Sequence, residues 1–354
     1  MSAPPECTSV ALRVRDLSVR FPGRDGSVKA VTGASFDARA GECVALVGES
    51  GCGKSVLTAS LLGLLPAGAE IAGNAWIDPA VSVDSATSAG STASGSTASF
   101  PTTSAIDVLA AAERVLRDRV RGRMVGLVPQ SPVTHVTPVR TIGSQLAETL
   151  RELGQDTPVE DAAARAHFPS DHLDHYPHEL SGGLAQRAAT ALALAGEPRL
   201  LLADEPTTSL DQPLVEDTMR ELRALVDRGH TVVLVTHDLT AAATVADRII
   251  VMYAGRIVET SPTAGFFDAP AHPYSEALLA ALPERGFTPI PGLAPELTRL
   301  PSGCAFRPRC SRATSACTES PTLDSIADTR EVACWHPSHT GPNERVEERQ
   351  NAPS

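Results

Sequence analysis

Gly48-Glu49-Ser50-Gly51-Cys52-Gly53-Lys54-Ser55 decides the fold of this 354-residue chain, because it reads G-x-x-x-x-G-K-S. An apolar run over residues 43–47 precedes it and predicts a buried strand. The mostly apolar residues 56–65 follow it and predict a helix. Strand, glycine-rich turn and helix, in this order, are the context in which the motif binds phosphate.

The residue types of this loop explain its chemistry. Its glycines let the backbone turn tightly, so that N–H groups converge on phosphate oxygens. Lys54 can then reach the β- and γ-phosphates, and the Ser55 hydroxyl can ligate Mg²⁺. The sequence therefore predicts a nucleotide-binding protein. We expect nucleotide contacts from Gly48, Glu49, Ser50, Gly51, Cys52, Gly53, Lys54, Ser55 and Val56.

Length and charge limit the class of protein. A chain of 354 residues is long enough for a full α/β core with a smaller appendage. The net charge of −12 and the pI near 5.3 argue against nucleic acid as a partner. The chain has no run of eighteen apolar residues, and its first residues do not resemble a signal peptide. We therefore expect a cytosolic protein.

Strands and helices are expected to alternate along the chain, which predicts a layered α/β fold around a mostly parallel sheet with antiparallel edge strands. Residues 12–21 are interpreted as an edge strand. The remaining strands are expected at residues 28–36, 124–128, 200–203 and 231–236, with a hairpin at 249–258. Helices are expected at residues 106–121, 141–153, 184–195 and 214–226, and a short helix is expected after a Thr157 N-cap.

Composition divides the chain further. Residues 78–105 are mostly Ser, Thr, Ala and Gly, and we interpret them as a disordered surface insertion. A boundary near residue 260 separates a nucleotide-binding domain (8–260), with a helical subdomain at about 131–185, from an extension over 261–340. Residues 341–354 are expected to be a disordered tail.

Two further motifs suit the hydrolysis of a nucleotide. Asp204 ends an apolar strand and is placed to hold the Mg²⁺ shell, while Glu205 is the natural general base for a water molecule. Ser181-Gly182-Gly183 precedes an alanine-rich helix, where a second anion site is expected because two glycines are costly in a first helical turn.

Taken together and in order, these motifs resemble the ATP-binding subunit of ABC transporters, a family of P-loop NTPases. The resemblance implies that Phe21 stacks on adenine, that Gln130 contacts Mg²⁺ and the attacking water, and that His237 touches the γ-phosphate. It implies that Ser209 to Asp211 cross between two ATPase subunits. It further implies that Ser181, Gly182 and Gly183 grip the ATP held by a partner's loop, so that the chain acts only as a dimer.

The C-terminal part resembles the oligopeptide and dipeptide importers of this family, through His272-Pro273-Tyr274 and the segment 300–310. This implies a second ATPase subunit (usually a paralogue), two membrane-spanning permeases and an extracytoplasmic solute-binding protein as partners, and a position on the inner face of the cell membrane. The alternatives are an ATPase of a nickel or metal-chelate importer and a soluble ABC ATPase outside transport.

Four cysteines crowd into this extension, namely Cys304, Cys310, Cys317 and Cys334. In a reducing compartment such clustering suggests a metal site rather than disulfides. The spacing C-x5-C-x6-C-x16-C is looser than that of most structural zinc sites. Four thiolates also hold iron–sulfur clusters, and some members of the resembled subfamily carry a 4Fe–4S cluster there. The cluster is the favoured expectation, and zinc and free or disulfide-linked thiols are the alternatives.

Overall fold

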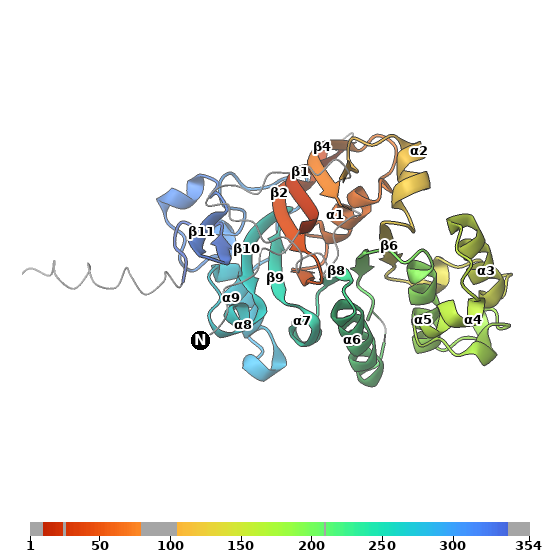
Figure 1. The fold of residues 1–354 in the computed structure, drawn as a ribbon. Helices are drawn as coiled ribbons and strands as arrows, with labels where there is room; N and C mark the ends of the chain where they lie inside the picture. Colours follow the sequence, from red (N-terminus) through yellow and green to blue (C-terminus); the bar gives the residue numbers. More distant parts are fainter. Residues whose placement is uncertain (1–9, 24–25, 79–104, 209, 339–354) are drawn as a thin grey trace, which may run out of the picture.

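The computed structural model describes residues 10–23, 26–78, 105–208 and 210–338, which build two β-sheets with helices packed around them (Figure 1). The expected insertion and tail lie largely outside these residues, at 79–104 and 339–354. The strands are β1 (Val10–Gly23), β2 (Gly26–Arg39), β3 (Cys43–Val47), β4 (Glu70–Ile77), β5 (Ile106–Asp107), β6 (Val125–Val128), β7 (Leu200–Asp204), β8 (Thr231–Thr236), β9 (Arg248–Tyr253), β10 (Arg256–Pro262), β11 (Asp324–Ala327) and β12 (Arg330–Val332). The helices are α1 (Lys54–Leu61), α2 (Glu113–Val115), α3 (Ile142–Leu153), α4 (Val159–Ala164), α5 (Gly182–Leu194), α6 (Gln212–Asp227), α7 (Leu239–Val245), α8 (Thr263–Asp268) and α9 (Pro273–Ala280).

The larger sheet has the order β11-β12-β10-β9-β3-β8-β7-β6 among the described residues. Its part from β9 to β6 is parallel, as predicted, and β3, which leads into the glycine loop, lies between β8 and β9. Every residue of β3 and β8 is buried, as expected for parallel strands covered on both faces. The carboxyl ends of these strands therefore meet at one edge of the sheet, where ligands of such folds bind.

The smaller sheet is antiparallel, with the order β2-β1-β4-β5. β1 pairs with β2 on one side and with β4 on the other, so the prediction that residues 12–21 form an edge strand is wrong. The error arose because β4 carries no clear alternation: its first five residues are exposed, and Gly73 interrupts it. Antiparallel strands thus occur in two places. They form this smaller sheet, and they form the side of the larger sheet that contains β10, β12 and β11.

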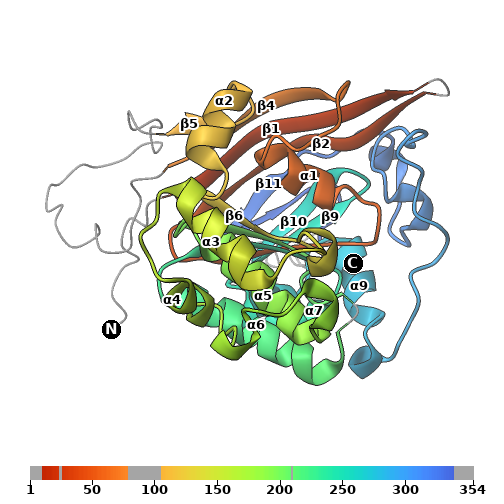
Figure 2. The same cartoon turned by 90° about the vertical axis from the view of Figure 1, so that its right-hand side faces the viewer.

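The large sheet lies between α3 to α7 on one face and β1 with α1 on the other (Figure 2), and an apolar cluster fills each side. Along β3, Cys43, Ala45 and Val47 join the cluster that includes residues of α3 to α7. Val44 and Leu46 point to the opposite cluster, which includes β1 and α1. This alternation is what a strand produces when both of its faces are buried.

Most predicted helices are present, and their ends follow from local chemistry. Thr141 caps α3, where its hydroxyl accepts a 3.3 Å hydrogen bond from Ser144 N–H, and Gly154 ends the helix in a left-handed conformation. The short helix α4 begins after Pro158, which takes the N-cap position predicted for Thr157. The helices α3, α4 and α5 gather at one side of the molecule, in yellow and green (Figures 1 and 2).

The prediction of one helix over residues 106–121 is wrong. Residues 106–107 form β5, and helical turns occur only at Glu113–Val115 and Leu116–Val120. Val108 N–H donates to Ala75 O at 2.8 Å, so pairing with β4 extends the start of this segment. Tertiary pairing outweighed the helix propensity of the alanines at 110–112.

Candidate functional site

The glycine loop has a backbone that only glycine tolerates at two positions. Gly48 and Gly53 have φ angles of 151° and 107°. A Cβ atom at Gly53 would lie 2.1 Å from Ala30 O, and one at Gly48 would lie 2.2 Å from Met252 O. The backbones of β2, at Ala30, and of β9, at Met252, therefore approach the loop so closely that they fix its path.

Lys54 is buried at the base of the loop, and its Nζ donates to Gly48 O at 2.8 Å and to Glu49 O at 3.2 Å. These carbonyls hold the ammonium group close to the loop that is predicted to bind the phosphates. Cys52 is also buried, whereas Ser50 and Gly51 are exposed. Burial raises the pKa of the Cys52 thiol, so Cys52 serves as a small neutral side chain within the loop.

Ser55 and Asp204 meet across the end of the sheet. Ser55 Oγ donates to Asp204 Oδ1 at 3.0 Å, although 149 residues separate the two along the chain. Burial raises the pKa of Asp204, because removing the carboxylate from water disfavours its charged form. A hydroxyl and a carboxylate in contact are a donor set that suits Mg²⁺. Val56, in the first turn of α1, is half-buried against the apolar cluster beneath it.

Glu205 is the centre of a cluster of three polar side chains. Its Oε2 accepts hydrogen bonds from Gln130 Nε2 at 3.2 Å and from Thr208 Oγ1 at 3.1 Å, and it lies 3.3 Å from His237 Nδ1. Glu205 has a φ of 46°, and its N–H donates to Val235 O at 2.8 Å. The structure thus brings together Glu205, Gln130 and His237. Thr208 was missed, although its position three residues after Glu205 in a turn was a usable signal.

The predicted signature Ser181-Gly182-Gly183 forms the start of α5. Ser181 Oγ accepts a 3.4 Å hydrogen bond from Leu184 N–H, so this serine is a helix cap. Ser181 and Gly182 are exposed, and α5 lies apart from α1 in both views (Figures 1 and 2). Asp211 similarly caps α6 through a 3.4 Å bond from Leu214 N–H. Ser209 lies outside the described residues.

Phe21, expected to stack on adenine, lies near the end of β1 opposite Val28 of β2. It is half-buried and packs against the cluster shared by β1 and α1. Its partial exposure leaves part of the aromatic ring open to solvent.

Cys304, Cys310, Cys317 and Cys334 line one small pocket together with Phe306, Trp335 and His336. All four are free thiols. Burial raises the pKa of Cys304 and Cys310, and it raises that of Cys334 to about 11. Within the described residues, no group of three or more His, Cys, Asp or Glu side chains is arranged to hold a metal ion.

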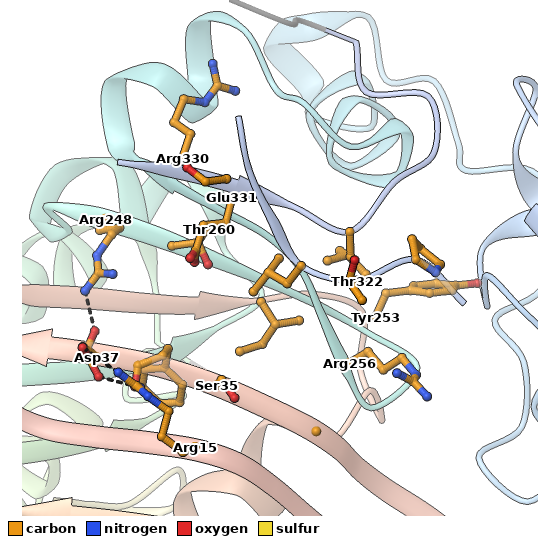
Figure 3. A pocket seen from close by; sticks show the side chains of 18 of the residues that line it. Arg15, Ser35, Asp37, Arg248, Tyr253, Arg256, Thr260, Thr322, Arg330 and Glu331 are labelled. Atoms are coloured by element: carbon orange, nitrogen blue, oxygen red, sulfur yellow. Dashed lines mark hydrogen bonds and ion pairs between the residues drawn. The ribbon is translucent and has the colours of Figure 1, made fainter. Parts of the chain in front are cut away.

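A cavity of about 1030 Å³ lies between β2 and the C-terminal extension (Figure 3). Asp37 faces it and forms ion pairs with Arg15 at 2.7 Å and with Arg13 at 3.2 Å, while Arg248 pairs with Glu42 at 2.9 Å. Among the described residues that line it, none belongs to the predicted nucleotide contacts. The cavity is therefore separate from the glycine loop.

Sequence reasoning also missed two partners of the glycine loop. Tyr274 OH accepts a 2.9 Å hydrogen bond from Glu49 N–H, and Arg309 forms an ion pair with the Glu49 carboxylate at 2.8 Å. Both partners come from the C-terminal extension, more than 200 residues away, and no local pattern announces such contacts.

The family model described as "ABC transporter" matches residues 31–208, which contain the glycine loop, Gln130, the signature and Glu205. The chain belongs to the ABC transporter family. This ABC transporter protein binds and hydrolyses ATP. A second model, "Oligopeptide/dipeptide transporter, C-terminal region", matches residues 258–317.

Relatives of this ABC transporter protein are similar along nearly their whole length. The "Probable peptide ABC transporter ATP-binding protein y4tR" of Sinorhizobium fredii is 37% identical, over 92% of this chain and 94% of the relative. The "Oligopeptide transport ATP-binding protein OppD" of Salmonella typhimurium is 35% identical, over 94% and 96%. In fold, the chain resembles the ATP-binding cassette MJ0796, with a TM-score of 0.56, 24% identity and coverage of 71% of this chain and 98% of that one. Among the helices of residues 10–338 that are described, none is both long and apolar enough to cross a bilayer.

Proposed function

We propose that this ABC transporter protein supplies the energy for import of oligopeptides or dipeptides. The observation that carries the proposal is the C-terminal extension, whose residues 258–317 match the oligopeptide/dipeptide transporter model. The extension is joined to the ATPase fold, because Glu259 of β10 pairs with Val332 of β12. The names of the relatives, which include oligopeptide and D,D-dipeptide transport proteins, support the same substrate class.

The proposed partners are a second ATPase subunit, two membrane-spanning permeases and an extracytoplasmic solute-binding protein. The exposed position of Ser181 and Gly182, apart from α1, supports a site completed by a second subunit. In this arrangement, the signature of one subunit contacts the ATP on the glycine loop of the other. The chain would then work on the cytoplasmic face of the membrane, bound to the permeases.

The proposed roles in hydrolysis follow from the contacts within the site. Glu205 accepts a proton from the attacking water or orients it, and Gln130 and His237 hold the carboxylate and the water in place. Lys54 stabilises negative charge on the transferred phosphoryl group. Ser55 and Asp204, with Gln130, would hold Mg²⁺, which neutralises phosphate charge when it is bound.

For the cysteines of the extension we retain the 4Fe–4S cluster as the proposed group. Four unpaired thiols that line one pocket supply the type of ligand that such a cluster takes, and Cys304, Cys310, Cys317 and Cys334 are the residues that would hold it. Anaerobically purified protein should then be brown and absorb broadly at about 400 nm. One zinc per chain in a colourless preparation would favour zinc, and neither metal would indicate free thiols.

Peptide uptake in cells tests the substrate class. Deleting the gene should abolish uptake of a radiolabelled tripeptide, wild-type protein should restore it, and Glu205→Gln should fail to restore it. Glu216→Gln is the matched control, because Glu216 is an exposed residue of α6. Normal peptide uptake combined with loss of nickel uptake in the deletion strain would contradict the proposal and favour metal-chelate import.

A further inference from the structure

We infer that Arg309 and Tyr274 of the C-terminal extension are positioning residues of the ATP site. Both restrain the glycine loop through Glu49, and Arg309 neutralises the Glu49 carboxylate. The inference rests on the proposed assignment of residues 48–55 as the ATP site. It goes further because it assigns part of that site to the extension that this subfamily adds to the ATPase fold.

The contact of Arg309 with Glu49 is bidentate, and it buries the arginine while the glutamate stays partly exposed. Arg309 Nη1 donates to Glu49 Oε2 at 2.8 Å, and Nη2 donates to Oε1 at 3.1 Å. Its Nε donates to Pro291 O at 2.7 Å, and the Arg309 side chain is only 4% exposed. The Glu49 carboxylate raises the pKa of Arg309 further above its ordinary value. Such fork-to-fork pairs are strong and fix orientation.

The rings of Tyr253 and Phe306 also contact the Arg309 guanidinium. The Cζ atom of Arg309 lies 5.8 Å from the ring centroids of both Tyr253 and Phe306, and its Nη1 donates to Tyr253 OH at 3.2 Å. The rings of Tyr253 and Tyr274 are 4.5 Å apart, and Phe306 lies 5.4 Å from Tyr274. Arg309 is therefore held in one position by packing, cation–π contacts and hydrogen bonds.

Tyr274 holds the same loop residue by its backbone. Its fully buried side chain reaches the loop, and its OH accepts the Glu49 N–H at 2.9 Å. The carbonyl of Glu49 meanwhile accepts from Lys54 Nζ at 3.2 Å. The N–H, the C=O and the carboxylate of one loop residue are thus all bound, and two of these three contacts come from the extension.

Charge gives this arrangement its functional consequence. ATP carries several negative charges to a loop that itself contains the Glu49 carboxylate, and an unpaired carboxylate there would repel the phosphates. Arg309 removes this repulsion and at the same time restrains the loop. Loss of Arg309 should therefore weaken ATP binding in two ways, and only the electrostatic part should disappear when Glu49 is also neutralised.

The experiment measures ATP affinity of the full-length chain, by equilibrium titration with a fluorescent ATP analogue and Mg²⁺. Arg309→Gln should weaken binding about tenfold, which corresponds to about 1.4 kcal/mol. The double variant Arg309→Gln, Glu49→Gln should recover most of that loss. Tyr274→Phe should weaken binding about threefold. Arg299→Gln removes an exposed arginine of the same extension and is the matched control, with affinity expected at the wild-type value.

Three further readouts separate positioning from folding. The deficit of Arg309→Gln should shrink as NaCl rises from 0.05 to about 1 M, because exposed like charges are screened. In the assembled transporter the KM for ATP should rise more than kcat falls. Should Arg309→Gln prove unstable, Arg309→Lys, which keeps the charge without the fork, must still bind ATP more tightly than Arg309→Met.

The failures are distinguishable. Lys54→Ala tests the ATP site itself, and wild-type affinity in that variant would overturn the proposed site. Loss of affinity in Lys54→Ala together with wild-type affinity in Arg309→Gln would overturn only the present inference. Failure of Glu49→Gln to rescue Arg309→Gln would also overturn it, because the deficit would then not arise from charge at Glu49.

Discussion

Glu205 illustrates how single residues are set up for chemistry. Its carboxylate is fixed by Gln130 and Thr208, and its backbone by Val235 O. We predict that Glu205→Gln lowers ATP hydrolysis by a factor of about 100 to 10,000, the range typical of a lost general base, while ATP binding is retained. Steady-state phosphate release from the assembled transporter measures the effect. Hydrolysis within twofold of wild type would contradict the role of Glu205.

Thr208 provides a finer test of the same cluster. Thr208→Val keeps the shape but removes the hydroxyl that donates to Glu205 Oε2 at 3.1 Å, and kcat should fall about tenfold. Thr208→Ser retains the hydroxyl and should keep most of the activity. Equal losses in the two variants would contradict this role of the hydrogen bond, because Thr208→Ser keeps the donating hydroxyl.

His230 couples stability to pH. It follows α6, and its ring lies 2.9 Å from Pro198 O through Nδ1. Burial lowers its pKa below the ordinary 6.5, so the unfolded chain binds a proton more readily than the folded one. This contribution to stability is present above pH 6.5 and is lost as pH falls below it. Urea unfolding at pH 7 and pH 5.5 should show a smaller drop for His230→Gln than for wild type.

Whether a residue of the site could be predicted depends on the sequence distance to the residues that it contacts. Lys54, Asp204 and Glu205 could be predicted because each lies in a short motif with its own strand or turn. Tyr274 and Arg309 could not be predicted, since their contacts with Glu49 span 225 and 260 residues. A sequence shows local geometry directly, whereas such distant contacts depend on how β9 and the extension pack.

Strands that are buried on both faces were predicted correctly, whereas a largely exposed strand was not. The predicted limits of β8 agree with the structure, because a continuous apolar run of branched residues in an α/β protein indicates a buried parallel strand. β4 was not foreseen, since Glu70–Ile77 alternates poorly and has exposed residues along most of its length. That one missing strand also caused the wrong edge assignment of β1, because register and neighbours are not local properties.

The junction of β10 and β12 supports a prediction of its own. Glu259 is fully buried, its carboxylate accepts from Ala271 N–H at 3.0 Å and from His272 N–H at 2.8 Å, and it pairs with Arg330 at 3.5 Å. Arg330→Met should destabilise the protein by about 3 kcal/mol, because it leaves a buried carboxylate without its cation. The midpoint of urea unfolding measures this loss.

The control for this junction is Glu331→Gln, an exposed residue of the same strand β12. It should shift the midpoint little. A similar shift in the two variants would show that the strand itself, and not the Arg330–Glu259 pair, determines the stability of the junction.

At the scale of the whole molecule, the exposed signature predicts an ATP-dependent assembly. Glu205→Gln with ATP and Mg²⁺ should double the mass of the ATPase particle in light scattering, with the chain alone or with its partner ATPase. Adding Ser181→Arg should prevent this, because a long cation would occupy the exposed start of α5. Ala147→Arg on the exposed side of α3 is the control and should still assemble. Assembly that survives Ser181→Arg would contradict a signature at the interface.

The position of β3 has a consequence for synthesis on the ribosome. The neighbours of this central strand are made much later, and Cys43 N–H bonds the Asp247 carboxylate across 204 residues of chain. At about 5–20 residues per second, the nascent strand waits about 10–40 s before β9 exists. During that interval an apolar strand with two unpaired sides is available to other chains, so newly made copies should depend on chaperones more than a protein built from consecutive hairpins would.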